Sequence, residues 1–213
     1  MKPLSAILRI IIPAIVVLTF NVRIHAQTTS MDFYSSHDIV STEGETFICQ
    51  LDTSRFVNEI IWFKAKLRNV ENTLYDCRIC DRRTGQPIHE EFYPEMLLDE
   101  VPFDSIIRKV FPTGSYYIAD KLAPHTEPSA ILFIIAYADP VSRKVLEVRF
   151  VLSYQDDSSI LSIPPSKLEQ LEKEIKEKVT VRFLLPEEVY KDEIKNANYL
   201  PASRSVYFTG PVE

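Results

Sequence analysis

Glycine is scarce in this sequence. Only four glycines occur among its 213 residues, and no two lie close together: Gly44, Gly85, Gly114 and Gly210. Loops that hold phosphate, and turns that present a nucleophilic serine, need glycine where the backbone turns tightly or lies against a ligand. The sequence therefore lacks a nucleotide-binding loop, a dinucleotide fingerprint and a nucleophile elbow, and the enzyme classes that depend on them are excluded.

In other respects the composition is that of a globular protein. Hydrophobic residues make up 46% of the chain and charged residues 25%. These values exclude a disordered tail and a disulfide-dense mini-protein. A chain of this length can bury a sizeable core in one or two domains.

Residues 1–26 have the pattern of an export signal. Lys2 and Arg9 give a positive start, residues 10–20 form an apolar run, and Ala26 precedes a cleavage point. The run is too short for a spanning helix, which needs about 20 residues. We predict cleavage after Ala26 and export to the periplasm or cell surface of a bacterium, with no stable membrane span afterwards. An uncleaved anchor is the alternative.

Loss of the leader makes the chain more acidic. The leader carries three basic residues and no acidic ones, so the formal net charge changes from 24 − 30 = −6 to 21 − 30 = −9. An acidic exported protein has no electrostatic reason to bind nucleic acid. The remaining partners are proteins or glycans, and the oligomeric state cannot be deduced from these patterns.

Alternating apolar residues predict a β-rich body over residues 27–155. Residues 60–68 place four apolar residues on one face and Trp62 with three cations on the other, as a half-buried antiparallel strand requires. Residues 130–138 are apolar throughout and residues 145–154 alternate, which predicts a buried hairpin. Residues 74–80 also alternate and predict a strand. The predicted fold class is α+β, mainly antiparallel β, with a β-sandwich-like body.

The pattern changes in residues 156–213, which predict a smaller helix-strand-helix-strand segment packed on the body. Ser166 and Glu169 have the spacing of a capping box. An amphipathic helix over residues 166–178 follows. Its apolar stripe consists of Leu168, Leu171, Ile175 and Val179. Such a stripe normally packs on its own protein, and docking to an envelope assembly is the alternative.

The three cysteines allow at most one bridge. Cys49 and Cys77 fall on predicted core faces, and a disulfide between them would close about 28 residues; two unpaired core thiols are the alternative. Cys80 is predicted to face outward, as a free thiol or in an intermolecular bridge. Cys77 and Cys80 have the C-x-x-C spacing of redox pairs, but residues three apart in a strand lie about 10 Å apart, too far for a bridge. The histidines are scattered, so no metal site and no cofactor is predicted.

Short motifs resemble two families of exported β-sandwich domains. Gly44-Glu45, Cys49, Trp62-Phe63-Lys64 and Tyr75-Asp76-Cys77 resemble an immunoglobulin-type domain. The two cysteines are only 77 − 49 = 28 positions apart, which leaves no room for the strands expected between them. The segments that are similar to macroglobulin-type domains are residues 56–68, 75–87 and 112–116. Both resemblances imply an antiparallel sandwich used for binding or scaffolding.

No catalytic constellation emerges from the sequence. We therefore predict an exported, non-enzymatic binding or structural protein of the bacterial cell envelope. Its predicted binding surface, for a protein or glycan, consists of Trp62, Tyr93, Tyr116 and Tyr117. One alternative is a component of an envelope or secretion assembly that docks through residues 166–178. The other is a small periplasmic hydrolase or thiol-redox enzyme.

Overall fold

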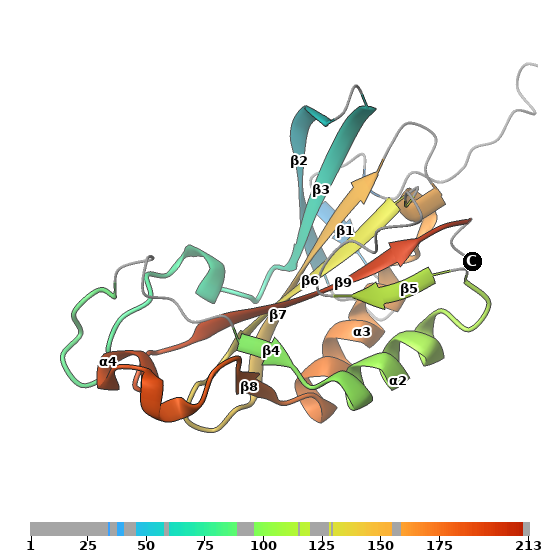
Figure 1. Ribbon diagram of the computed structural model, residues 1–213. Coiled ribbons are helices and arrows are strands. Elements are labelled where there is room, and N and C mark those ends of the chain that lie inside the picture. The colour runs from blue at the N-terminus through green and yellow to red at the C-terminus, as the bar shows by residue number, and fades with distance from the viewer. Residues whose placement is uncertain are drawn as a thin grey trace, which may run out of the picture. The chain divides into compact units, whose positions relative to one another are not determined.

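Nine strands form one open sheet. A computed structural model describes residues 34, 38–40, 46–57, 60–88, 96–114, 116–119, 128, 130–154 and 159–210, all within the unit Phe33–Glu213. The strand order is β1-β2-β3-β7-β6-β9-β4-β8, and β5 pairs with β9 beside this path (Figure 1). The bounds are β1 Asp38–Val40, β2 Thr46–Val57, β3 Ile60–Asn69, β4 Met96–Leu98, β5 Tyr116–Ala119, β6 Ala130–Ala138, β7 Val145–Tyr154, β8 Val181–Phe183 and β9 Leu200–Phe208. All pairings are antiparallel except the short parallel contact between β4 and β9.

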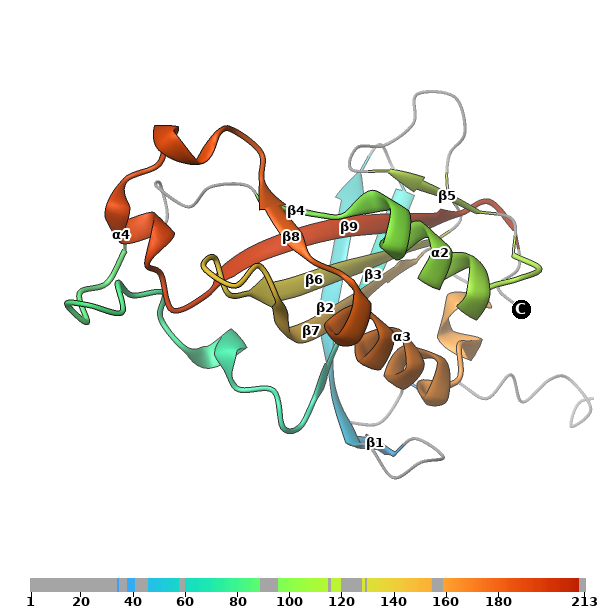
Figure 2. The same ribbon diagram turned by 90° about the horizontal axis from the view of Figure 1, so that it is seen from below.

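Two helices cover one face of this sheet. Figure 2 shows α2 and α3 side by side across strands β6, β7 and β9. The described helices are α2 Glu100–Val110, α3 Pro165–Lys178, α4 Asp192–Lys195 and the single 3₁₀ turns η1 Leu74–Asp76, η3 Ser159–Ser162 and η4 Glu187–Val189. The α+β, mainly antiparallel class is thereby confirmed. A sandwich is not shown, because every strand that the structure describes belongs to the same sheet.

The hairpin of β6 and β7 is the centre of the sheet, as predicted from its apolar run. Leu132 lies opposite Leu152 and Ile134 opposite Phe150, and all four side chains are fully buried. The turn is held by Asp139, whose Oδ1 accepts hydrogen bonds from the backbone N–H groups of Val141 and Ser142. Contacts between such apolar side chains on opposite strands stabilise the pairing of β6 with β7.

The last strand of the chain lies inside the sheet. β9 pairs with β6 over nine positions, from Ala130 opposite Phe208 to Ala138 opposite Leu200. The other edge of β9 pairs with β5 and β4. The division of the chain at residue 155 stays a prediction. The predicted leader, residues 1–26, lies outside the described residues.

The predicted strand over residues 74–80 is wrong. The chain leaves the sheet after β3, and residues 74–76 form the 3₁₀ turn η1. Asn72 explains the departure, because its side-chain amide donates to the carbonyl oxygen of Val148 and so occupies the edge of β7. Cys77 follows this turn and is exposed, so its predicted place on a core face is also wrong.

The amphipathic helix α3 has its predicted stripe but not its predicted start. Leu168, Leu171 and Ile175 are fully buried. Pro165 is the first helical residue, and no side chain caps the N-terminus. The predicted capping box is wrong, because Ser166 lies within the first turn of the helix and not before it. Pro165 takes the first helical position, where the fixed φ of proline is favourable.

Candidate functional site

The sheet has one face against the helices and one face turned away from them. Leu67, Phe150 and Ile134 pack in one core with apolar residues of α2 and α3. Residues between such positions point to the opposite side, because side chains alternate along a strand. We call this side the far face. Its described members include Lys64, Lys66, Arg68, Tyr117, Ile131, Phe133, Ile135, Arg149, Val151, Ser153, Ser203, Ser205 and Tyr207. On β2, Ile48 lies opposite Arg68 and Gln50 opposite Lys66.

Figure 1 shows α2 and α3 below strands β6, β7 and β9, and β2 and β3 rising on the opposite side. The curved pair β2–β3 therefore borders the far face. Neither of the two long helices reaches it.

The centre of the far face is apolar. Ile131, Val151 and Tyr207 are only 7%, 8% and 4% exposed, and none of them belongs to the core beneath the helices. Tyr207 stacks on Tyr117, with ring centroids 4.9 Å apart and planes 9° apart. Phe133 is half-buried between Val151 and Ser205.

The border of the far face along β3 is cationic. Lys64, Lys66 and Arg68 occupy alternate positions of β3, and Arg149 of β7 lies directly opposite Arg68. Arg68 donates one hydrogen bond of 2.7 Å to the carbonyl oxygen of Asn72. The four cations are half-buried, so their charges are desolvated more than those of an ordinary surface patch.

Only one of the four aromatic residues predicted to bind can be placed on the far face. Tyr117 lies there through its stack on Tyr207. Tyr116 points to the helix side, where its ring meets Phe111 and Phe208 edge-on, and burial raises the pKa of its hydroxyl. The backbone of Trp62 in β3 pairs with that of Arg55 in β2. The side chain of Trp62 and the whole of Tyr93 lie outside the described residues. The alternating cations of residues 64–68 are the sequence signal for this face, but the alternation alone predicts only a half-buried strand.

The cysteines form no disulfide in the structure. Cys49 is buried and its thiol lies 3.6 Å from the carbonyl oxygen of Tyr34. Cys77 is exposed and Cys80 half-buried. The Cys49–Cys77 bridge was predicted because both residues were expected on core faces. Cys77 is exposed and lies in no strand, so that reason no longer holds. Within the described ranges, no group of three or more His, Cys, Asp or Glu side chains is placed to hold a metal ion.

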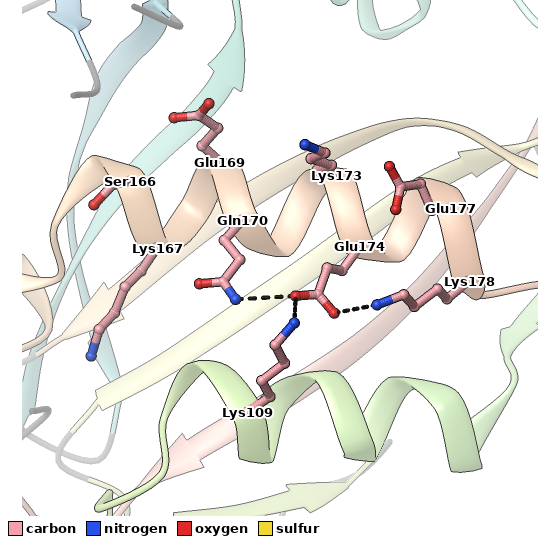
Figure 3. A pocket seen from close by; sticks show the side chains of 9 residues that line it. All are labelled: Lys109, Ser166, Lys167, Glu169, Gln170, Lys173, Glu174, Glu177 and Lys178. Carbon is pink, nitrogen blue, oxygen red and sulfur yellow. Dashed lines mark hydrogen bonds and ion pairs between the residues drawn. The ribbon is translucent and has the colours of Figure 1, made fainter. Parts of the chain in front are cut away.

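A groove of about 430 Å³ separates α2 from α3, and Figure 3 shows the side chains that line it. Glu174 lies at its centre. Its carboxylate accepts hydrogen bonds from Lys109 of α2 at 2.6 Å, from Lys178 at 2.8 Å and from Gln170 at 3.1 Å. The hydrogen bond from Lys109, followed by those from Lys178 and Gln170, lowers the pKa of Glu174 to about 2. We interpret this cluster as a joint between the two helices rather than as a ligand site.

The joint predicts a specific pH dependence of stability. The pKa of Glu174 in the folded state is below its ordinary value of 4.5. Its ionised carboxylate therefore contributes to the free energy of unfolding at pH values above 4.5. The contribution is lost as the pH falls through the range from 4.5 towards 2. Replacing Glu174 by Gln should lower the free energy of unfolding at pH 7 by about 1–3 kcal/mol, a range that allows for the exposure of both lysines.

Urea unfolding at several pH values measures this effect. The Glu174→Gln variant should lose stability less steeply than the wild type between pH 5 and 3. Glu177→Gln, at an exposed position of the same helix, is the matched control and should shift stability by less than about 0.5 kcal/mol. Equal pH profiles for the wild type and Glu174→Gln would contradict the joint.

A second groove lies beside α3, where the chain passes from β3 to η1. Asn72 donates to the carbonyl oxygen of Val148 at 2.9 Å and to the carboxylate of Glu172 at 3.1 Å. Glu147 accepts hydrogen bonds of 2.9 Å from the backbone N–H groups of Thr73 and Leu74. These bonds fix the loop to β7 and α3, so this groove also has a structural explanation.

Comparison with known proteins supports the fold but names no function. No protein-family model matches the chain, and no curated protein matches it. A crystal structure of a DUF5043 family protein from Bacteroides uniformis ATCC 8492 is similar, with a TM-score of 0.52 and 18% sequence identity. The match covers 84% of this chain and 89% of that chain. At this identity the likeness shows the fold alone.

This likeness corrects the family resemblance drawn from the short motifs. The similar structure is a DUF5043 family protein, and no immunoglobulin-type or macroglobulin-type family was found. The motif Tyr75-Asp76-Cys77 lies in a 3₁₀ turn and the residue after it rather than in a sandwich strand. In the described part of the chain, no helix has the length and hydropathy needed to cross a bilayer.

Proposed function

We propose that this chain is an exported, non-enzymatic binding protein of the bacterial cell envelope and that it holds its partner on the far face. The observation that carries the proposal is the combination of an apolar centre with a cationic border on the side of the sheet away from α2 and α3. Export is supported by the leader pattern of residues 1–26.

The far face has the properties of a binding surface rather than of an ordinary solvated sheet. A strand of a solvated antiparallel sheet normally places polar residues on its outer side. Here the apolar residues Ile131, Phe133, Ile135 and Val151 occupy neighbouring positions on two strands, and Ile131 and Val151 are buried. Apolar side chains at the centre supply affinity, and charged side chains at the border supply orientation.

The assembly alternative has less support. Leu168, Leu171 and Ile175 of α3 are fully buried in the core of the same chain. The apolar stripe that would have docked on a partner is therefore occupied. The exposed remainder of α3 is charged, and charged helix surfaces commonly face solvent.

The proposal is tested by blocking the far face without disturbing the core. Ser203 is exposed and lies opposite Ile135 in the ladder between β6 and β9. Ser203→Trp should therefore leave the fold intact and place a bulky side chain on the far face beside Ile135. We expect at least a tenfold loss of the envelope component retained by the purified chain, measured by mass spectrometry after incubation with envelope extract.

Two further variants make the result specific. Trp62→Ala tests the aromatic residue predicted to bind and should also reduce retention while leaving the melting temperature within a few degrees. Ser142→Trp, at an exposed position of the β6–β7 turn, is the matched control and should retain as much as the wild type. Undiminished retention by Ser203→Trp would reject the far face as the binding surface.

A further inference from the structure

Exposed apolar side chains gather in one short segment after β8. Among the described residues, eight large hydrophobic side chains are exposed, and three of them lie within six positions. Leu184, Leu185 and Val189 are 47%, 51% and 64% exposed, and Pro186 between them is exposed as well. We call these four residues the β8 patch. Single apolar residues on a surface need no explanation, but clustered ones commonly mark an interaction site.

The segment that carries the β8 patch is fixed to the fold. The hydroxyl oxygen of Tyr190 accepts a hydrogen bond of 3.1 Å from the backbone N–H of Leu185. The ring of Tyr190 packs on that of Phe183, with centroids 4.7 Å apart. Glu187 forms an ion pair of 2.7 Å with Arg143 of the β6–β7 turn. The apolar side chains are therefore presented by an ordered turn, and a partner does not have to order it on binding.

The charges around the β8 patch are balanced, unlike those of the whole chain. Residues 182–191 contain the basic residues Arg182 and Lys191 and the acidic residues Glu187 and Glu188. Their formal charge is 2 − 2 = 0, against −6 for the whole chain. Copies of an acidic protein repel each other in general, so contact between them requires a surface without an excess of negative charge. The segment around the β8 patch meets this condition.

We propose that the β8 patch binds a second copy of this chain in a symmetric dimer, which goes beyond the proposed function. In a dimer with two-fold symmetry, both chains contribute the same surface. Leu185 lies midway in sequence between Arg182 and Glu188, and both charged side chains are exposed. When two such segments cross in opposite directions at Leu185, each Arg182 lies near the partner's Glu188. Apolar side chains then meet at the axis, and opposite charges meet at the rim.

An added peptide strand fits β8 less well than a second copy does. A peptide that extends a sheet requires a free strand edge. The backbone N–H of Val181, the first residue of β8, donates to the carbonyl oxygen of Arg143. Lys144 pairs with Thr180 just before the strand. Because β8 is only three residues long, too little of its outer edge remains for a peptide, and binding must come from side chains.

A membrane surface also fits the β8 patch less well. Glu187 and Glu188 separate the exposed leucines from Val189, and both are exposed. Anionic lipid attracts basic segments and repels acidic ones, and the whole chain has a formal net charge of −6. We therefore expect no binding to vesicles of phosphatidylglycerol in a flotation assay.

Sedimentation equilibrium of the purified full chain measures the association. A small apolar surface is typical of a transient complex, so the mean mass should rise from one chain towards two between about 5 and about 500 µM. A reducing agent is present throughout, because Cys77 is exposed and an intermolecular disulfide would imitate a dimer. A mass of one chain at every concentration overturns the inference.

A charged side chain in the β8 patch should break the dimer. Leu185→Glu should weaken association by about tenfold or more, because it buries an unpaired carboxylate at the axis. The melting temperature should stay within a few degrees of the wild type, since the side chain is exposed. The matched control is Val70→Glu, at a valine that is 48% exposed outside the patch, and it should associate like the wild type. Equal association of Leu185→Glu and the wild type also overturns the inference.

An exchange of charges tests the symmetry of the dimer. Arg182→Glu alone and Glu188→Arg alone should each weaken association by about fivefold, because like charges then meet at both ends of the interface. An equimolar mixture of the two variants should associate like the wild type, since each reversed charge finds an opposite charge on the other chain. A mixture that associates no better than its components contradicts the proposed symmetric contact.

Other occupants of the β8 patch give distinct results. If the wild type stays monomeric while Leu185→Glu loses a component retained from envelope extract, the patch binds a different protein and the inference is wrong. If the wild type stays monomeric and floats with phosphatidylglycerol vesicles while Leu185→Glu does not, the patch binds membrane and the inference is equally wrong. Neither result decides the proposed function, which is tested at Ser203 on the far face.

Discussion

A chain that ends at Tyr199 should not fold cooperatively. This truncation removes β9, which pairs with β6 over nine positions and with β5 over four. It also removes Leu200, Val206 and Phe208, which are fully buried. Each large core side chain contributes about 1.5–3 kcal/mol by burial, and a domain of this kind is stable by about 5–15 kcal/mol. The loss of these side chains and of a central ladder should exceed that margin.

Circular dichroism, urea titration and limited proteolysis measure the result. The matched control is a chain that ends at Thr209, which keeps all of β9 and should melt cooperatively like the full chain. A cooperative transition of the chain ending at Tyr199 would show that the remaining sheet is stable without β9.

Replacing Asn72 by Ala should lower the free energy of unfolding by about 2–4 kcal/mol. Asn72 is 5% exposed, and its amide joins the edge of β7 to α3 through Val148 and Glu172. The substitution takes a donor from a backbone carbonyl and from a carboxylate that is itself 5% exposed. Lys176 stays 3.8 Å from this carboxylate, but removing a hydrogen-bond donor from a buried carboxylate is still costly.

A double-mutant cycle separates this network from simple loss of packing. Glu172→Gln combined with Asn72→Ala should be less destabilising than the sum of the two single variants. Asn196→Ala is the control, because its amide bonds the carbonyl oxygen of Asp192 within its own short helix, and it should cost less than about 1 kcal/mol. Strict additivity of the two changes at 72 and 172 would contradict a shared network.

The correct sequence predictions all depended on short-range periodicity. The hairpin of residues 130–138 and 145–154, and the stripe of residues 168–179, were recognisable because alternation or helical spacing reports the face that a segment buries. The same rule failed for residues 74–80, which also alternate. There, a competing interaction between Asn72 and the backbone of Val148 ended the strand, and no local pattern contains that contact.

The candidate site could be predicted only in part. The cations of residues 64, 66 and 68 are visible as an alternating series, but Arg149 joins them only because β7 pairs with β3. Tyr117 reaches the far face while Tyr116 turns into the core, and adjacent aromatic residues in a sequence do not reveal which of them faces which side. Cys77 was placed on a core face by a strand that does not form.

The sequence by itself determined the low glycine content that excludes phosphate-binding loops, the alternation that makes strands and the stripe that makes α3. The tertiary structure decided that these strands join one sheet, that β9 lies inside it beside β6 and that four cations border an apolar surface. The physical reason is the distance along the chain over which each kind of interaction acts. Local patterns specify which side of a segment avoids water, whereas the neighbour of each strand depends on burial and hydrogen bonds between residues distant in the chain.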